Sequence, residues 1–230
     1  MVTIPWLPDD EIWFPDPERA LVQPDGLLAA GGDLTPARLI AAYRQGIFPW
    51  YSAGDPILWW SPNPRCVFFP DRFHISRSLR RQLHRNDYRI SYDTSFAQVM
   101  HACAAPRGDD NGTWITPEMS HAYLALHQLG VAHSIEVWRE DALIGGLYGL
   151  AIGRIFYGES MFSRATGGSK IALAHLTARL SRQGYFLLDC QVHSPHLESL
   201  GAHCIDRSEF RRILNRWTAP TIQGLWDTPF

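Results

Sequence analysis

The strongest constraint on the fold lies between residues 155 and 192, where the sequence predicts a strand, a helix and a second strand in succession. Ile155 to Phe162 and Phe186 to Val192 are short apolar runs of strand length. Between them, Ser169 to Gln183 places apolar residues at helical spacing and ends before Gly184. Two further runs, Ser134 to Arg139 and Ala142 to Ala151, are separated by two residues and predict a hairpin. Together these elements predict a mixed α/β sheet.

The composition is typical of a globular protein without a strong charge bias. The chain has 230 residues, 46% of them hydrophobic and 19% charged, enough for about one large domain or one and a half ordinary ones. A net charge of −2 gives no global nucleic-acid footprint, so any such contact must come from a local patch. The apolar runs are too short to cross a membrane and the first ten residues lack a secretory pattern, so we expect a cytoplasmic protein.

Residues 1–62 and 63–230 differ in pattern and predict two domains. The first stretch is rich in Pro, Trp and Gly and contains one clear helix, which follows the cap Thr35 and ends at Gly46. The second contains the predicted sheet and most of the helices. Helices are expected near Ser76, at Phe96 to Ala105, at Pro117 to Leu129, near His196 to Leu200 and from the cap Ser208 to Trp217, with a strand at Cys66 to Phe69 and a polar loop over residues 105–112.

Two acids interrupt otherwise apolar strands. In the run Phe186 to Val192, alternation predicts that Asp189 and Gln191 share one face. Glu159 interrupts the preceding strand in the same way. A carboxylate is costly to bury without partners, so if the two strands lie close together these side chains converge on a cleft suited to an amine. The alternatives are structural: Asp189 caps the turn after its strand, and Glu159 pairs with an arginine such as Arg164.

Two stretches offer contacts to nucleic acid. The helix near Ser76 carries Arg77, Arg81 and Arg85 on one face, because they are spaced four residues apart. Such a face either binds phosphates or is simply solvated. Aromatic residues crowd residues 48–51 and 57–62, where they form either a packed subdomain, which the sequence alone favours, or a groove on which bases stack.

Two other patterns concern metals and cofactors. One metal-like spacing consists of Cys190, His193, His196 and Cys204. Zinc ligands usually come in tighter pairs, so helix-end and packing roles are favoured and we expect no metal. The loop Arg164 to Ser169 resembles the segment with which N-acetyltransferases of the GNAT fold hold the pyrophosphate of coenzyme A at a helix N-terminus. Ser169 replaces the last small residue of that pattern, so the loop indicates the fold more than the cofactor.

Motifs along nearly the whole chain resemble those of the leucyl/phenylalanyl-tRNA–protein transferase family. They are Gly26-Leu-Leu-Ala-Ala-Gly-Gly-Asp-Leu34, Gly46-Ile-Phe-Pro-Trp50, Asp55-Pro-Ile-Leu-Trp-Trp-Ser-Pro62, His74-Ile-Ser-Arg-Ser78, Gly112-Thr-Trp-Ile-Thr116, His133-Ser-Ile-Glu-Val-Trp138, Gly158-Glu-Ser-Met-Phe-Ser163 and Leu188-Asp-Cys-Gln191. Only residues 1–12 and 218–230 carry no diagnostic pattern. The resemblance implies a small N-terminal α+β domain packed on a C-terminal GNAT-like mixed-sheet domain.

The resemblance also implies a reaction. Leu, Phe or sometimes Met would pass from its aminoacyl-tRNA to the α-amine of a protein that begins with Arg or Lys. The product would carry a destabilising N-terminal residue, which is a degradation signal in bacterial N-end rule proteolysis. No cofactor is implied, and we expect a monomer.

Site residues follow from the same resemblance. In the family the Asp and Gln of the DCQ motif, here Asp189 and Gln191, are the catalytic proton relay, and Glu159 contacts the α-amino group of the transferred residue. An Asp with a reference pKa of about 3.9 is a poor base for an ammonium, so we expect Asp189 to orient the amine while Gln191 passes or holds the proton. The other substrate-binding residues would be Trp50 and Trp114 at the terminal adenosine, Leu147, Phe156, Met161, Leu176 and Leu188 around the amino-acid side chain, and Arg77, Arg81 and Arg85 at acceptor-stem phosphates.

Two other functions compete with this interpretation. An acetyl-CoA-dependent N-acetyltransferase on the same fold is favoured by the loop at Arg164 and opposed by Ser169 and the N-terminal region. A non-enzymatic RNA-binding module is opposed by the nearly neutral charge and by the acids within strands.

Overall fold

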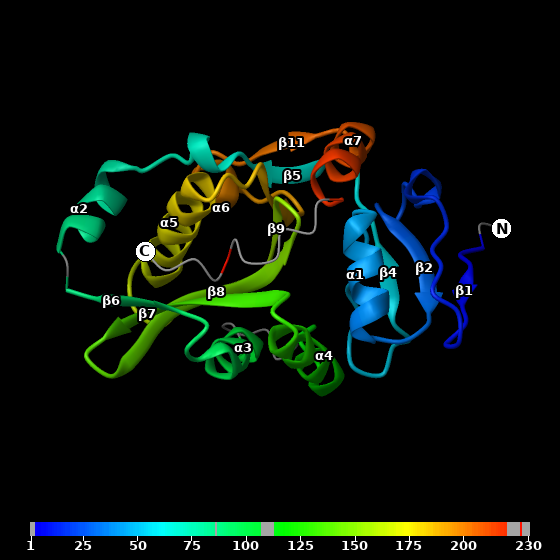
Figure 1. Cartoon of the computed structure of the whole chain (residues 1–230), viewed down its shortest axis with the longest axis horizontal. Helices are drawn as coiled ribbons and strands as arrows, with labels where there is room; N and C mark the ends of the chain where they lie inside the picture. Colours follow the sequence, from blue (N-terminus) through cyan, green and yellow to red (C-terminus); the bar gives the residue numbers. More distant parts are fainter. Residues whose placement is uncertain (1–2, 86, 107–112, 220–225, 227–230) are drawn as a thin grey trace.

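Two sheets organise the computed structural model, which describes residues 3–85, 87–106, 113–219 and 226 (Figure 1). The N-terminal sheet has the strand order β1-β2-β4-β3 and the larger sheet has the order β11-β5-β10-β9-β8-β7-β6. The strands of the first are β1 (Trp6–Leu7), β2 (Leu27–Gly31), β3 (Phe48–Pro49) and β4 (Leu58–Trp60). Those of the second are β5 (Arg65–Phe68), β6 (Arg89–Tyr92), β7 (Ala132–Arg139), β8 (Ala142–Ile152), β9 (Ile155–Ser163), β10 (Leu187–Gln191) and β11 (His203–Ile205).

The helices begin where the sequence offers caps. The Thr35 hydroxyl accepts the N–H of Arg38 at the start of α1 (Pro36–Arg44), and Thr116 does the same for Met119 in α4 (Pro117–Gln128). The remaining helices are α2 (Arg77–Arg85), α3 (Phe96–Ala104), α5 (Gly168–Arg182), α6 (Pro195–Glu198) and α7 (Arg207–Trp217), with short 3-10 turns at Pro17–Arg19 and Pro70–Arg72.

The order of elements in the larger sheet confirms the expected fold class. Strand β6 is followed by α3 and α4, then by the antiparallel strands β7, β8 and β9, and then by α5 and β10. β10 pairs in parallel with β9, so the crossover predicted between residues 155 and 192 is present. The result is a GNAT-like mixed sheet that carries a smaller N-terminal α+β unit.

One helix start was predicted wrongly, and one predicted loop lies mostly outside the residues that the structure describes. Ser208 was expected to cap the last helix, but α7 already begins at Arg207 and Asp206 occupies the N-cap position. Asp and Ser are both favoured at this position, so the local sequence does not decide between them. The polar loop expected over residues 105–112 falls mostly outside the described residues.

The two sheets share a hydrophobic cluster. Helix α1 packs against α4 and β8, and Leu39 and Tyr43 of α1 join Tyr123 and Tyr157 in that cluster. The last strand of the N-terminal sheet in chain order ends at Trp60, and the first strand of the larger sheet begins at Arg65. The division into residues 1–62 and 63–230 stays a prediction.

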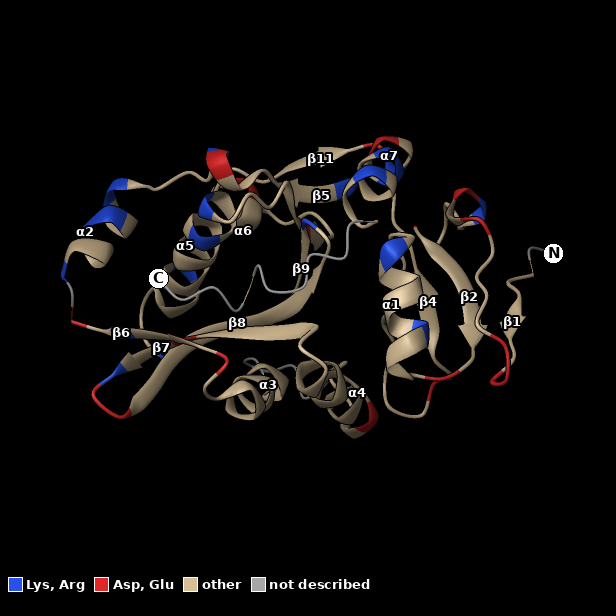
Figure 2. Cartoon of the chain, viewed as in Figure 1, with Lys and Arg blue, Asp and Glu red and all other residues tan. Residues whose placement is uncertain are grey.

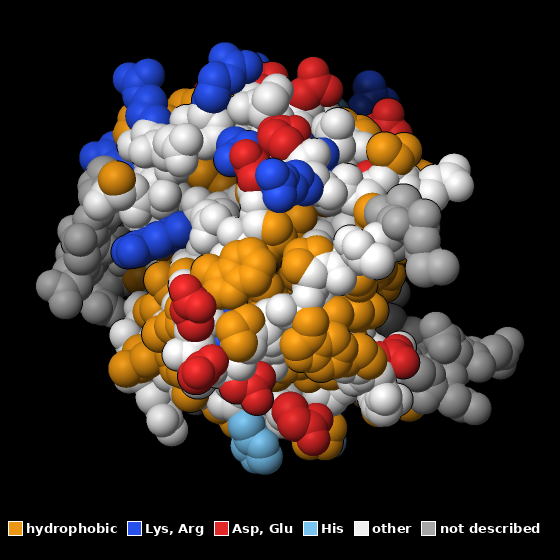
Figure 3. Space-filling view, turned by 90° about the vertical axis from the view of Figure 1, so that its right-hand side faces the viewer, with side chains coloured by type: hydrophobic (Ala, Val, Ile, Leu, Met, Phe, Trp, Pro, Cys, Tyr) orange, Lys and Arg blue, Asp and Glu red, His pale blue; other side chains and the backbone are white. Residues whose placement is uncertain are grey.

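Charge is distributed unevenly between the two parts. Residues 1–62 contain eight acidic and three basic side chains, whereas residues 63–230 contain 15 acidic and 18 basic ones. Basic side chains lie along α2, α5 and α7 in Figure 2. The end of the molecule formed by the N-terminal sheet shows hydrophobic side chains among acidic ones in Figure 3. A polyanion would therefore approach the larger sheet and its helices rather than this end.

Candidate active site

The site forms where β9 and β10 separate. The two strands are paired from Leu187 opposite Ile155 to Asp189 opposite Tyr157, and beyond that point each turns away from the other. Both strands carry an irregularity at the separation. In β9, Gly158 and Ser160 face consecutive residues of β8, so Glu159 is the extra residue of a bulge. In β10, Asp189 and Gln191 face consecutive residues of β5, so Cys190 is extra. Bulges re-aim side chains and often occur beside active sites.

The backbone around these bulges leaves little room for larger residues. Gly149 of β8 faces Gly158, and a Cβ atom at Gly149 would lie 2.1 Å from the carbonyl oxygen of Tyr157. Only glycine fits this approach. Gln191 has a φ of +58°, a left-handed conformation that is uncommon for a residue other than glycine.

The β10 bulge makes one prediction wrong. Simple alternation placed Asp189 and Gln191 on the same face of the strand. In the structure Leu188, Cys190 and Gln191 all line an apolar cavity, whereas Asp189 lines none of the pockets described here. The extra residue and the left-handed backbone at Gln191 reverse its direction. The expectation that Glu159 and Gln191 converge is confirmed.

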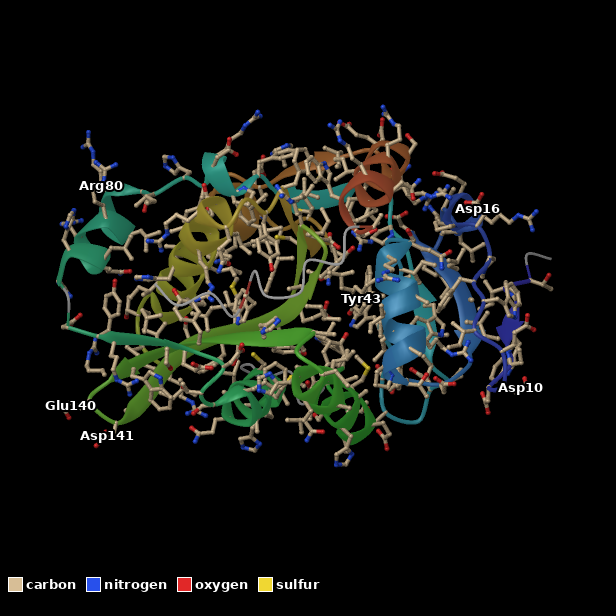
Figure 4. All side chains as sticks on the ribbon, in the orientation of Figure 1. Asp10, Asp16, Tyr43, Arg80, Glu140 and Asp141 are labelled. Atoms are coloured by element: carbon tan, nitrogen blue, oxygen red, sulfur yellow. The ribbon has the colours of Figure 1, made fainter. Side chains whose placement is uncertain are left out.

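Glu159 is held by partners on both carboxylate oxygens. The Gln191 side-chain amide donates to Oε1 at 2.9 Å, and the Tyr123 hydroxyl donates to Oε2 at 2.9 Å. The hydroxyl of Tyr43, which points from α1 toward the larger sheet in Figure 4, forms a hydrogen bond with that of Tyr123. The alternative pairing with Arg164 is wrong, because that guanidinium stacks on the ring of Phe162.

Burial dominates the electrostatics of this carboxylate. It raises the pKa of Glu159 to about 7, aided by the nearby charge of Asp189, while hydrogen bonds from Tyr43 and Tyr123 and the charge of Arg65 act in the opposite direction. Burial also raises the pKa of both tyrosines well above the usual value, so both hydroxyls remain protonated donors at neutral pH. Glu159 therefore titrates in the physiological range.

Asp189 is fully buried in an ion pair that the sequence did not reveal. Arg65 of β5 donates from Nε to Oδ1 at 2.8 Å and from Nη2 to Oδ2 at 2.7 Å, and both side chains have 0% exposure. Arg65 also donates from Nη1 to the carbonyl of Gly46, which follows α1. The backbone N–H of Gln191 donates to Asp189 Oδ1 at 2.9 Å. Asp189 thus caps the local turn, as the structural alternative proposed, and at the same time fixes Gln191.

Two cavities meet at Glu159 and Gln191. The first has a volume of about 120 Å³ and an apolar lining. Four of the five residues predicted for the amino-acid side chain, Leu147, Met161, Leu176 and Leu188, line it together with Leu173 and Leu197, which were not predicted. Phe156 does not belong to that lining, because its ring stacks on Trp226. The second cavity, of about 280 Å³, is lined by Trp50, Trp114, Phe48 and Val192, and both cavities also share Cys190.

The predicted arginines gather on the outer surface of α2. Arg77, Arg81 and Arg85 line a shallow groove with Arg80 and His84, and Arg80 points outward in Figure 4. Leu79 on the opposite side of the helix is buried. The helix therefore has the single basic face that the spacing predicted.

In the loop that resembles a pyrophosphate site, protein groups engage or crowd part of the N-terminus of α5. The Ser163 hydroxyl accepts the N–H of Ser169 at 2.8 Å, so one of the free donors at the N-terminus of α5 is satisfied. The side chain of Gln82 from α2 lies against Gly167, where its Oε1 would be 2.1 Å from an added Cβ. Within the described residues, no group of three or more His, Cys, Asp and Glu side chains could hold a metal ion. No helix in that part of the chain is long and apolar enough to cross a membrane.

Comparisons with known proteins identify the family of this chain. Two family models match, the leucyl/phenylalanyl-tRNA protein transferase over residues 67–215 and its N-terminal domain over residues 32–63. The chain is 62% identical to the leucyl/phenylalanyl-tRNA–protein transferase of Nitrosomonas europaea over 90% of this chain and 87% of the relative, and 56% identical to that of Stutzerimonas stutzeri over 91% and 92%. Among solved structures, a GCN5-related N-acetyltransferase from Kribbella flavida aligns with a TM-score of 0.40 at 11% identity, over 74% of this chain and 60% of that one. The chain belongs to the leucyl/phenylalanyl-tRNA–protein transferase family.

Proposed function

We propose that this protein transfers Leu, Phe or Met from aminoacyl-tRNA to the α-amine of proteins that begin with Arg or Lys. One observation carries the proposal. A carboxylate and an amide, Glu159 and Gln191, lie at the junction between an apolar cavity and a tryptophan-lined cavity. An aminoacyl ester joins an apolar side chain to a nucleoside through one carbonyl. The apolar cavity fits the side chain, the junction at Glu159 and Gln191 fits the carbonyl, and the tryptophan-lined cavity fits the nucleoside.

The acyl side chain occupies the first cavity. A dry cavity of about 150 Å³ accommodates benzene. At about 120 Å³, and open toward the second cavity, the first cavity has the size needed for a leucine or phenylalanine side chain.

The terminal adenosine lies between Trp50 and Trp114, and the acceptor stem follows the basic side of the molecule. Trp50 is 47% exposed, so its face is available for stacking, which contributes about 1–3 kcal/mol per base. Arg77, Arg81 and Arg85 then contact phosphates. The body of the tRNA makes few contacts, because the acidic N-terminal end repels it.

The reaction needs little more than positioning. A free α-amine has a reference pKa of about 7.7–8, so part of it is neutral at pH 7 and can attack the ester carbonyl. Gln191 orients the reacting groups, and Asp189 is a positioning residue that acts through it, since its own carboxylate lines neither cavity. Holding the amine and the ester together lowers the barrier without a metal or a cofactor.

The product carries Leu, Phe or Met at its N-terminus, and we propose that it is a degradation signal of the N-end rule type. Charged tRNA is the donor, so the reaction belongs in the cytoplasm. The protein works as a monomer, because both cavities are formed within one chain.

An acetyl-CoA-dependent N-acetyltransferase is the main alternative, and the occupied N-terminus of α5 speaks against it. Isothermal titration distinguishes the two. We expect the protein to bind a non-hydrolysable leucyl- or phenylalanyl-adenosine analogue and to give no heat with acetyl-CoA. As a control, Trp114→Ala should weaken binding of the adenosine analogue and leave the titration with acetyl-CoA unchanged. Binding of acetyl-CoA without binding of the analogue would refute the proposed function.

A further inference from the structure

Glu159 borders the two cavities directly, whereas Asp189 lines neither of them. Among the described residues that line the two cavities, Glu159 is the sole carboxylate, and it belongs to the walls of both. Asp189 is fully buried and both its oxygens are engaged by Arg65. Any proton that leaves an amine at the junction of the cavities therefore meets Glu159 first.

A chain of hydrogen bonds between protein groups holds the Glu159 carboxylate in place. It starts on α1, crosses α4, β9, β10 and β5, and returns to the second residue after the end of α1. Its members in order are Tyr43, Tyr123, Glu159, Gln191, Asp189, Arg65 and Gly46. The Glu159 carboxylate accepts the Gln191 amide at Oε1 and the Tyr123 hydroxyl at Oε2, and because a carboxylate has about four lone-pair sites it can also accept a substrate proton.

We propose that Glu159 is the proton shuttle of the transfer reaction and that Tyr123, supported by Tyr43, is the positioning residue that holds it. This inference rests on the proposed function and adds a role to the same site. Glu159 therefore does more than contact the α-amino group of the transferred residue, and Asp189 takes up no proton during the reaction.

The proposed step conserves protons and electrons. The nitrogen lone pair of the neutral α-amine forms a bond to the ester carbonyl carbon, and the carbonyl electron pair moves to oxygen. An oxygen of ionised Glu159 takes one proton from the nitrogen, which has become positively charged. When the intermediate collapses, the carbonyl re-forms, the bond to the ribose oxygen breaks, and that oxygen takes the proton from Glu159. The products are an amide and a free ribose hydroxyl, and Glu159 is again ionised.

The electrostatic surroundings suit this task. Burial raises the pKa of Glu159 to about 7, close to the reference value of about 7.7–8 for an α-amine. The titratable and charged groups around it are Tyr43, Tyr123, Tyr148, Arg65, Asp189 and Cys190. Burial raises the pKa of the Cys190 thiol well above its usual range, so this thiol remains protonated and does not compete as a base.

The first test separates proton transfer from contact with the donor's α-amino group. Phenylalanyl-tRNA and phenyllactyl-tRNA differ only in that the second has a hydroxyl in place of this amino group. If Glu159 carries the proton, Glu159→Gln should lower kcat at least about a hundredfold with both donors, the usual contribution of a general base. If Glu159 serves only to bind the amino group, the variant should match the wild-type protein with phenyllactyl-tRNA, and the proposal would be wrong.

The second test uses the pH dependence of kcat and does not need phenyllactyl-tRNA as a substrate. The Tyr123 hydroxyl donates to Glu159 and favours its ionised form, so Tyr123→Phe should raise the pKa of Glu159. The shuttle must start ionised, so the acidic limb of the profile should move to higher pH by roughly one unit. The acceptor peptide is the same for both proteins, so its own ionisation cancels in the comparison.

Tyr88→Phe is the matched control, because Tyr88 bonds to Leu83 and His175 rather than to Glu159. Its profile should coincide with that of the wild-type protein. An unshifted acidic limb in Tyr123→Phe would overturn the proposal. A wild-type protein that transfers no acyl group from either donor would instead contradict the proposed function itself.

Discussion

The buried ion pair between Arg65 and Asp189 gives the clearest quantitative prediction. Replacing Asp189 with Asn keeps the shape of the side chain but leaves the Arg65 guanidinium charged, with 0% exposure and two donors that have lost their carboxylate. Breaking a buried pair in this way costs about 3–5 kcal/mol. Domains are typically stable by about 5–15 kcal/mol, so a large part of the stability is lost.

Urea unfolding measures this loss as a fall in the midpoint at constant slope. The matched control removes both partners, as Arg65→Met with Asp189→Leu. No buried charge then remains, and Met can still pack between the rings of Phe48 and Phe210 that now flank the guanidinium. The double variant should therefore be more stable than Asp189→Asn. The ion pair does not hold the site as described if Asp189→Asn lies within about 1 kcal/mol of the wild-type protein. The same conclusion follows if the stability losses of Arg65→Met alone and Asp189→Leu alone add up to that of the double variant.

The remaining predictions concern substrate contacts. Asp189→Ala should slow transfer at least about tenfold without weakening tRNA binding, because its carboxylate acts through Gln191; unchanged turnover would remove it from the mechanism. Arg77→Ala with Arg81→Ala should weaken tRNA binding and reduce its salt slope by about 1.5–2, and an unchanged slope would make this face solvated surface. Trp50→Ala should weaken binding of an aminoacyl-adenosine analogue by about 1–3 kcal/mol, whereas Trp13→Ala should not, because Trp13 lines neither cavity. Leu176→Val enlarges the cavity and should shift preference from Leu toward Phe by about 1 kcal/mol, measured as a ratio of kcat/KM values.

Local signals allowed much of the fold to be predicted. Thr35 caps α1 as expected, because a hydroxyl followed by proline favours a helix start regardless of distant contacts. The crossover between β9 and β10 was predicted because a strand, a helix and a strand follow each other in a short stretch. The start of α7 was misplaced because Asp206 and Ser208 are both good caps.

The site could be predicted only in part, because its geometry depends on contacts between distant residues. Asp189 and Gln191 attracted attention as polar residues in an apolar run, but the bulge that separates their directions comes from pairing with β5, more than one hundred residues earlier in the chain. Tyr123 carries no local signal of its role. An arginine inside the short strand β5 was the one available sign that a buried carboxylate existed nearby.

The most direct test of the account is a transfer assay with the whole protein. Leucyl-tRNA or phenylalanyl-tRNA with a labelled amino acid is incubated with two peptides that differ only in beginning with Arg or with Asp. We expect label to appear at the N-terminus of the Arg peptide alone, and Glu159→Gln to slow its appearance at least about a hundredfold. Absence of label from the Arg peptide, with a correctly folded protein and intact aminoacyl-tRNA, would contradict the account.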